Sequence, residues 1–158
     1  SAGVRKMGGR IRPGRAAASA RVEYSSFARD EAILTMIVRI GTAGYAYPAW
    51  VGGFYPRGTA AHDMLPHYAT RFAAVEINSS FYRPPTREQA EKMARRTPAG
   101  FGFTLKVPQS VSHEFSPDDL PPFKAAADRL AGNGKLLGLI LQFAETFRNS
   151  PAERKWVA

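Results

Sequence analysis

The sequence predicts an α/β fold in which apolar strands alternate with amphipathic helices. Three observations support this prediction. Four short apolar runs are each followed by a segment with helical spacing, and glycine, proline and polar residues separate these segments. The 158 residues are 44% hydrophobic and 22% charged, which is typical of one globular core. Such alternation predicts a parallel sheet with helical crossover connections.

The first two predicted strands lie on either side of a helix. An apolar run over 36–42 ends in a glycine loop and predicts the first strand. Apolar residues at helical spacing predict a helix near 61–72. The second strand is predicted at 73–80, where alternation places Glu76 and Asn78 on one face.

The later elements follow the same order. Thr86 and Gln89 form a capping-box pattern that predicts the start of a helix ending near Thr97. A third strand at 101–108 and a helix near 121–131 come next. The fourth strand is predicted at 136–143, and Ser150, Pro151 and Glu153 indicate the start of a final helix.

Two architectures fit four strand–helix units: an open doubly wound sheet, or part of a (β/α)8 barrel. A complete barrel needs roughly 250 residues, so four units amount to half of one. We expect residues 36–158 to form a half TIM-type barrel with four parallel strands and flanking helices. Residues 1–35 are basic, lack apolar periodicity and predict a disordered extension, and Met36 is a candidate natural start.

Composition excludes several kinds of site. The chain has no cysteine, which removes thiolate chemistry, and no apolar run long enough to span a membrane. No Walker loop or dinucleotide fingerprint occurs, and His113-Glu114 lacks the second histidine of a helical metal motif, so no cofactor or metal is expected. The absence of a secretory h-region favours a cytoplasmic location. The net charge of +9 favours anionic partners such as nucleic acid or phosphorylated metabolites. A basic surface that is only solvated is the alternative.

Several motifs resemble one family. They are Gly41–Tyr47, Trp50-x-Gly52-x-Phe54-Tyr55-Pro56, Val75–Tyr82, Lys106-x-Pro108 with His113, and Gln142. Over about residues 37–150 the chain resembles the N-terminal half of the bacterial YecE-like family, or domain of unknown function 72, whose known folds are TIM-type barrels. The chain has Ala43 and Tyr45 where the family usually has Ser and Trp, and it lacks the usual Pro-Pro pair after Gln142. The resemblance implies a barrel, truncated here, and no established reaction.

The candidate catalytic residues follow strands. Glu76 and Asn78 lie near the end of the second strand, Lys106 near the end of the third and Gln142 near the end of the fourth. Function gathers at the C-terminal ends of barrel strands, so these groups are expected to converge. Glu76 is a candidate general base or substrate anchor, and Lys106 a binder of an anion or carbonyl. A buried Glu76–Lys106 ion pair that only fills the barrel is the alternative.

Further candidates come from loops. The resemblance adds His113 to the catalytic set. Tyr45, Trp50 and Tyr82 are candidate stacking residues for sugars or bases, although a packed aromatic lid is the alternative. Arg83 is a candidate phosphate contact, and Asn78 and Gln142 would orient a substrate.

The residues predict a pocket without identifying a reaction. We expect an enzyme-like site for a small anionic or sugar-containing ligand. The alternatives are a nucleic-acid-binding protein and a truncated product without independent activity. Self-association through open sheet edges is a further expectation.

Overall fold

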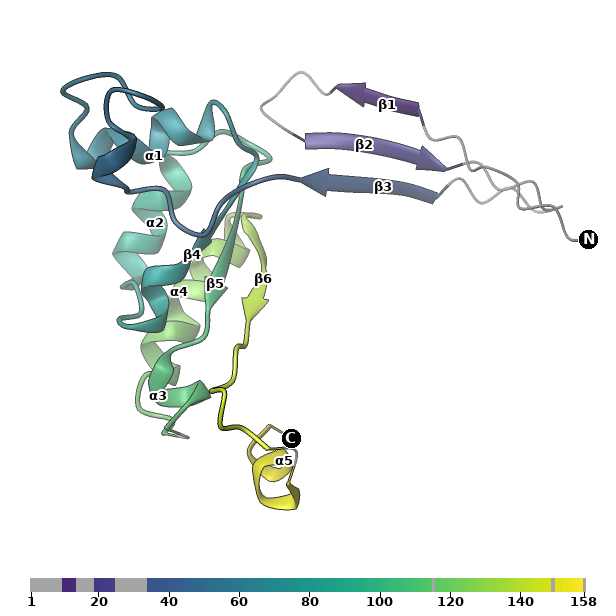
Figure 1. Ribbon diagram of the computed structural model, residues 1–158, viewed down its shortest axis with the longest axis vertical. Coiled ribbons are helices and arrows are strands. Elements are labelled where there is room, and N and C mark those ends of the chain that lie inside the picture. Colours follow the sequence, from purple (N-terminus) through teal and green to yellow (C-terminus); the bar gives the residue numbers. More distant parts are fainter. Residues whose placement is uncertain (1–9, 14–18, 25–33, 115, 149, 158) are drawn as a thin grey trace, which may run out of the picture.

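The computed structural model describes residues 10–13, 19–24, 34–114, 116–148 and 150–157, and side chains are described from residue 37 onward. Strands and helices alternate along most of this chain (Figure 1). The strands are β1 (Arg10–Pro13), β2 (Ser19–Tyr24), β3 (Leu34–Arg39), β4 (Ala74–Ile77), β5 (Gly102–Lys106) and β6 (Leu136–Ile140). The α-helices are α1 (Ala61–Ala69), α2 (Arg87–Arg95), α3 (Gln109–Ser112), α4 (Leu120–Gly132) and α5 (Pro151–Val157). Short 3-10 helices cover Pro48–Trp50 and Asn78–Phe81.

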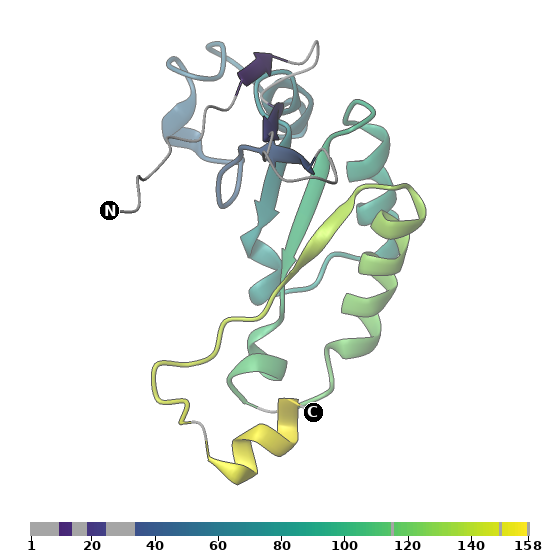
Figure 2. The ribbon, with the colours of Figure 1, turned by 90° about the vertical axis from the view of Figure 1, so that its right-hand side faces the viewer.

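The strands β4, β5 and β6 form a parallel sheet in that order, so the predicted α/β class is confirmed. Helices α2 and α4 lie along one face of this sheet (Figures 1 and 2). Val75 and Ile77 of β4, and Phe103 and Leu105 of β5, are buried in the core beneath the helices. Each such side chain stabilises the fold by about 1.5–3 kcal/mol.

The opposite face of the sheet is not covered by any described helix (Figure 1). Side chains alternate along a strand, so Glu76 of β4 and both Thr104 and Lys106 of β5 belong to this face. All three are half-buried, whereas their neighbours Ile77 and Leu105 are buried. The face that carries the candidate polar residues is therefore the open one.

The predicted first strand is divided between two environments. Strand β3 pairs antiparallel with β2, in a separate sheet ordered β1-β2-β3. The segment 40–44 then runs beside β4, where the Glu76 N–H donates to the Thr42 carbonyl at 3.0 Å and the Gly44 N–H to the Glu76 carbonyl at 2.8 Å. The described parallel sheet thus has three strands and not the predicted four, and 40–44 takes the place of the first.

The N-terminal prediction also differs from the structure. Disorder was predicted for 1–35, but β1 and β2 form an antiparallel pair in register from Arg10 opposite Glu23 to Pro13 opposite Ala20. The apolar periodicity used to predict strands does not detect short segments rich in arginine and alanine. Residues 1–9, 14–18 and 25–33 lie outside the described residues.

Helices α2 and α4 agree with the sequence prediction, whereas α3 forms where a loop was predicted. Thr86 and Gln89 form both hydrogen bonds of the capping box at the start of α2. Helix α4 covers the predicted helical segment and buries Phe123, Ala126, Ala127 and Leu130, which lie at helical spacing. The second predicted strand ends early, at Ile77, because the 3-10 helix begins at Asn78. No described helix is long and apolar enough to cross a membrane.

Candidate functional site

Phe81 is the centre of a small cluster at the C-terminal ends of β4 and β5. The Lys106 Nζ lies 4.6 Å from the centroid of the Phe81 ring, a cation–π contact. The His113 ring packs edge-on against Phe81 at 5.1 Å, and the Tyr82 ring does the same at 5.1 Å. Two of the three predicted catalytic residues therefore touch one aromatic ring.

Local hydrogen bonds fix this cluster in place. The buried Ser80 hydroxyl lies 2.6 Å from the carbonyl oxygens of both Ile77 and Lys106, which ties the 3-10 helix to the end of β5. A hydrogen-bond donor is favoured at residue 80 because a buried carbonyl oxygen without a hydrogen bond destabilises the folded state. Phe81 follows directly and is thereby placed over Lys106.

The His113 ring is oriented by its neighbour Ser112. The Ser112 hydroxyl donates to the Pro108 carbonyl at 3.0 Å and lies 2.8 Å from His113 Nδ1. When the single proton of the serine hydroxyl is donated to this carbonyl, His113 Nδ1–H is the donor of the second bond. In the neutral ring, Nε2 is then left with a lone pair that can accept a proton or a ligand hydrogen.

Glu76 and Lys106 share a face but form no ion pair with each other among the described residues. The Glu76 backbone is bonded to 42–44, and no described residue donates a hydrogen bond to its carboxylate. The buried Glu76–Lys106 ion pair, which was the structural alternative to a functional site, is therefore not formed. Asn78 begins the 3-10 helix that follows β4 and is half-buried. It precedes Phe81 by three residues in the same 3-10 helix.

Among the other predicted binding residues, Tyr82 contacts Phe81 through its ring. Tyr82 is 77% exposed and Arg83 is exposed next to it. Gln142 is exposed beyond the end of β6, and no hydrogen bond joins its amide to a described residue. Tyr45 packs against the Tyr68 ring at 6.2 Å, and burial raises the pKa of its hydroxyl.

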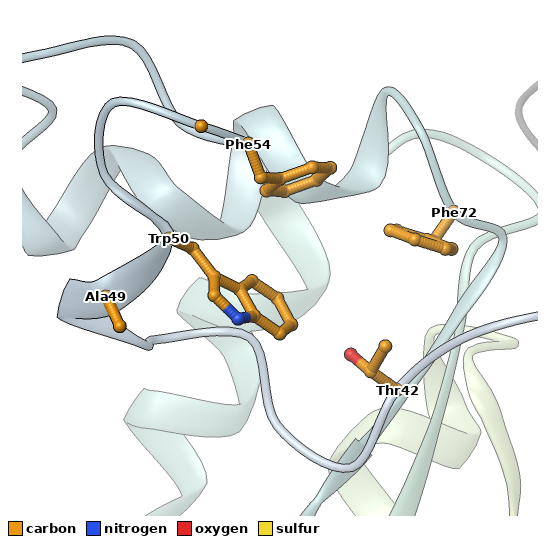
Figure 3. A pocket seen from close by; sticks show the side chains of 6 residues that line it. Thr42, Ala49, Trp50, Phe54 and Phe72 are labelled. Carbon is orange, nitrogen blue, oxygen red and sulfur yellow. The ribbon is translucent and has the colours of Figure 1, made fainter.

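Trp50 lines a separate aromatic pocket of about 360 Å³ (Figure 3). Its walls are the rings of Trp50, Phe54 and Phe72, together with Thr42, Ala49 and Gly53. Phe72 precedes β4 and Phe81 follows it, so the pocket and the Phe81 cluster lie at opposite ends of this strand.

The aromatic residues around this pocket are largely packed against one another. Phe54 contacts Trp50 at 5.6 Å and Phe72 at 5.8 Å, and the buried Tyr55 hydroxyl donates to the Tyr45 carbonyl. Burial raises the pKa of Tyr55 to about 12. Most of the predicted aromatic cluster therefore acts as structural packing.

Sequence reasoning did not single out Phe81, Ser80 or Ser112 as site residues. The available signal was the serine and aromatic run that follows β4, where polar groups interrupt a buried segment. No group of three metal-ligating His, Asp or Glu side chains occurs among the described residues.

Comparison with known proteins identifies the family. A family model described as "Protein of unknown function DUF72" matches residues 39–158. The UPF0759 protein YunF of Bacillus subtilis is 27% identical over 101 residues, which cover 59% of this chain and 36% of YunF.

Solved structures agree with this match. A DUF72 family protein from Thermotoga maritima superposes with a TM-score of 0.64 and 29% identity, and the match covers 75% of this chain and 49% of that protein. A DUF72 family protein from Enterococcus faecalis gives 0.63 and 22%, covering 75% and 44%. The chain spans less than half the length of these relatives. With a family model matching most of its length, the chain belongs to the DUF72 family.

Proposed function

We propose that this chain forms one half of a (β/α)8 barrel and contributes a site for a small anionic or sugar-containing ligand. Glu76, Asn78, Lys106 and His113 would form its polar wall. The observation that carries the proposal is the convergence of Lys106 and His113 on Phe81, at the strand ends where barrel enzymes hold their ligands.

The half-barrel architecture is supported by the order of the chain segments. Segment 40–44 runs beside β4, β4 pairs with β5 and β5 with β6, all in parallel. The solved relatives are about twice as long as the matched region. The uncovered face of the sheet would then be the inside of the barrel, which the second half would enclose.

Each polar group has a distinct role in this proposal. The Lys106 ammonium supplies a positive charge for a carboxylate or phosphate, and Phe81 holds it by the cation–π contact. His113 Nε2 accepts a proton, since Ser112 fixes the other nitrogen. The Glu76 carboxylate, which has no described ion-pair partner, would accept hydrogen bonds from ligand hydroxyl groups.

A titration with glucuronate, gluconate and citrate tests this site. We expect these anions to shift the backbone amide resonances of residues 78–82, 106 and 113. Lys106→Met should weaken binding by about tenfold because it removes a charge-assisted contact. The control is Lys124→Met, which makes the same change in charge at an exposed lysine of α4.

Two results would contradict the proposal. One is the absence of shifts at residues 78–113 with every anion, and the other is an equal effect of Lys106→Met and Lys124→Met. The nucleic-acid alternative predicts instead that an oligonucleotide binds with a steep dependence on salt, which a gel shift at two ionic strengths measures.

A further inference from the structure

A charged groove of about 320 Å³ lies between α2 and α4, in the helical layer that covers the other face of the sheet. Its lining residues are four cationic and two anionic side chains, namely Arg87, Lys92, Arg95 and Arg129 with Glu88 and Glu91. The groove thus carries an excess of two positive charges. It is separate from the Phe81 cluster, whose Lys106 belongs to the uncovered face.

Glu91 fixes two of these cations. The Arg95 Nε donates to Glu91 Oε1 at 2.6 Å, and the Arg129 Nε lies 2.5 Å from Glu91 Oε2. Asn133 donates a further bond to Oε2 at 3.0 Å and is itself anchored to the Arg129 carbonyl. The bonds from Arg129, Arg95 and Asn133 lower the pKa of Glu91 to about 2, so this anchor stays ionised at neutral pH.

The attachment through Nε leaves the outer side of each guanidinium available. No described residue accepts a hydrogen bond from the terminal nitrogens of Arg95 or Arg129. Nor does a described carboxylate form a salt bridge with Arg87 or Lys92. Two oriented guanidinium groups and two further cations therefore border one compact space.

We propose that this groove binds a phosphate-bearing ligand, with Arg95 and Arg129 as bidentate donors and Arg87 and Lys92 as additional charges. Arginine matches the geometry of phosphate oxygens with two parallel N–H donors. An excess of two charges suits a phosphoryl group better than a singly charged carboxylate. The small volume suits one or two linked phosphates better than an extended polynucleotide. Glu91 also lines the groove, and it acts as a positioning residue because its two carboxylate oxygens are bonded to Arg95 and Arg129.

The test is a calorimetric titration of the full chain with pyrophosphate, with inorganic phosphate and an eight-residue oligothymidylate as parallel probes. We expect pyrophosphate to bind more tightly than either. Arg95→Lys keeps the charge but loses the planar fork, and Lys92→Gln removes one charge. Each should weaken pyrophosphate binding at least about fivefold. Both side chains are exposed, so neither change should unfold the protein.

Lys124→Gln is the matched control for Lys92→Gln, since it removes the same charge from α4 at a lysine paired with Asp128 at 2.6 Å. It should leave pyrophosphate binding unchanged. Equal losses in the Lys92 and Lys124 variants would overturn the proposal and indicate nonspecific charge attraction. So would the absence of pyrophosphate binding, or tighter binding of the oligothymidylate. Lys106→Met separates this site from the proposed barrel site, because it should not change pyrophosphate binding in the groove.

Discussion

Glu91 joins two helices through a single carboxylate. Its partners Arg129 and Asn133 come from α4 and the residue that follows it, while Arg95 lies one turn along α2. Ordering these long side chains costs conformational entropy. Several hydrogen bonds to one carboxylate offset this cost better than the single bond of an isolated surface ion pair does. The cluster therefore also stabilises the packing of α2 on α4.

The low pKa of Glu91 predicts a pH dependence of stability. The pKa is about 2 in the folded protein against 4.5 for the unperturbed group, so the stabilisation is complete above about pH 4.5 and is lost as the pH falls towards 2. The difference in free energy of unfolding between the natural protein and Glu91→Gln should thus shrink between pH 5 and pH 2. Urea denaturation at a series of pH values measures it.

Glu145→Gln serves as the control for that experiment, because Glu145 is exposed and lies outside the cluster. Its effect on stability should be small at every pH. A Glu91→Gln penalty that stays constant from pH 5 to pH 2 would show that the carboxylate does not act through its charge.

Two lysine residues show which side-chain contacts the sequence can predict and which it cannot. Lys106 was assigned to a pocket from its position near a strand end, and the structure places it against Phe81. Lys135 belongs to none of the motifs found in the sequence. It is buried, and its Nζ donates to the Thr97 carbonyl, the Thr97 hydroxyl and the Pro98 carbonyl at 2.7–2.8 Å, while burial lowers its pKa. No local pattern distinguishes a lysine that binds the end of a distant helix from an exposed one.

At the level of elements, a glycine sets how closely segment 40–44 approaches β4. A Cβ on Gly41 would lie 2.0 Å from the Ala74 carbonyl oxygen, so any other residue forces the two backbones apart. Gly41→Ala should destabilise the protein by about 1–3 kcal/mol, as overpacking against a rigid neighbour does. Thermal unfolding measures the loss, and the Glu76 amide, which donates to the Thr42 carbonyl, should exchange its hydrogen faster.

Gly132→Ala, at the end of α4, is the matched substitution. Nothing lies within 4 Å of a Cβ built there, so alanine should be neutral or stabilise the helix by up to about 1 kcal/mol. Equal effects of the two substitutions would mean that the contact between 40–44 and β4 does not limit stability.

Helices were more predictable than strands because their signals are local. The capping box at Thr86 and the spacing of Phe123, Ala126, Ala127 and Leu130 each lie within a few turns. Strand limits depend on partners that are remote in sequence. β4 ends at Ile77 because Ser80 turns back to bind Lys106, and β3 pairs with a segment that lacks an apolar pattern.

For the molecule as a whole, the sequence predicted the layers better than the site. The alternation along β4 correctly placed Glu76 on the face opposite Val75 and Ile77, which are buried beneath the helices. It could not show that Trp50 lies at the opposite end of β4 from Phe81, because the loop 45–60 has no periodicity to direct it. Lys106 from a strand end and His113 from beyond it meet at Phe81, whereas Gln142 is exposed beyond β6 and Trp50 lines the separate pocket.

The exposed leucines of β6 and its neighbouring residues predict that this chain self-associates. Leu137, Leu139 and Leu141 are 42%, 51% and 44% exposed, and β6 forms an edge of the described parallel sheet. Because an apolar edge strand with unpaired backbone groups pairs readily with another chain, we expect reversible self-association through β6. Sedimentation velocity over a concentration range should show Leu139→Lys to be more monomeric than the natural protein. Leu120→Lys changes a similarly exposed leucine at the start of α4 and should not, since a helix offers no such edge; equal behaviour of the two variants would place the contact elsewhere.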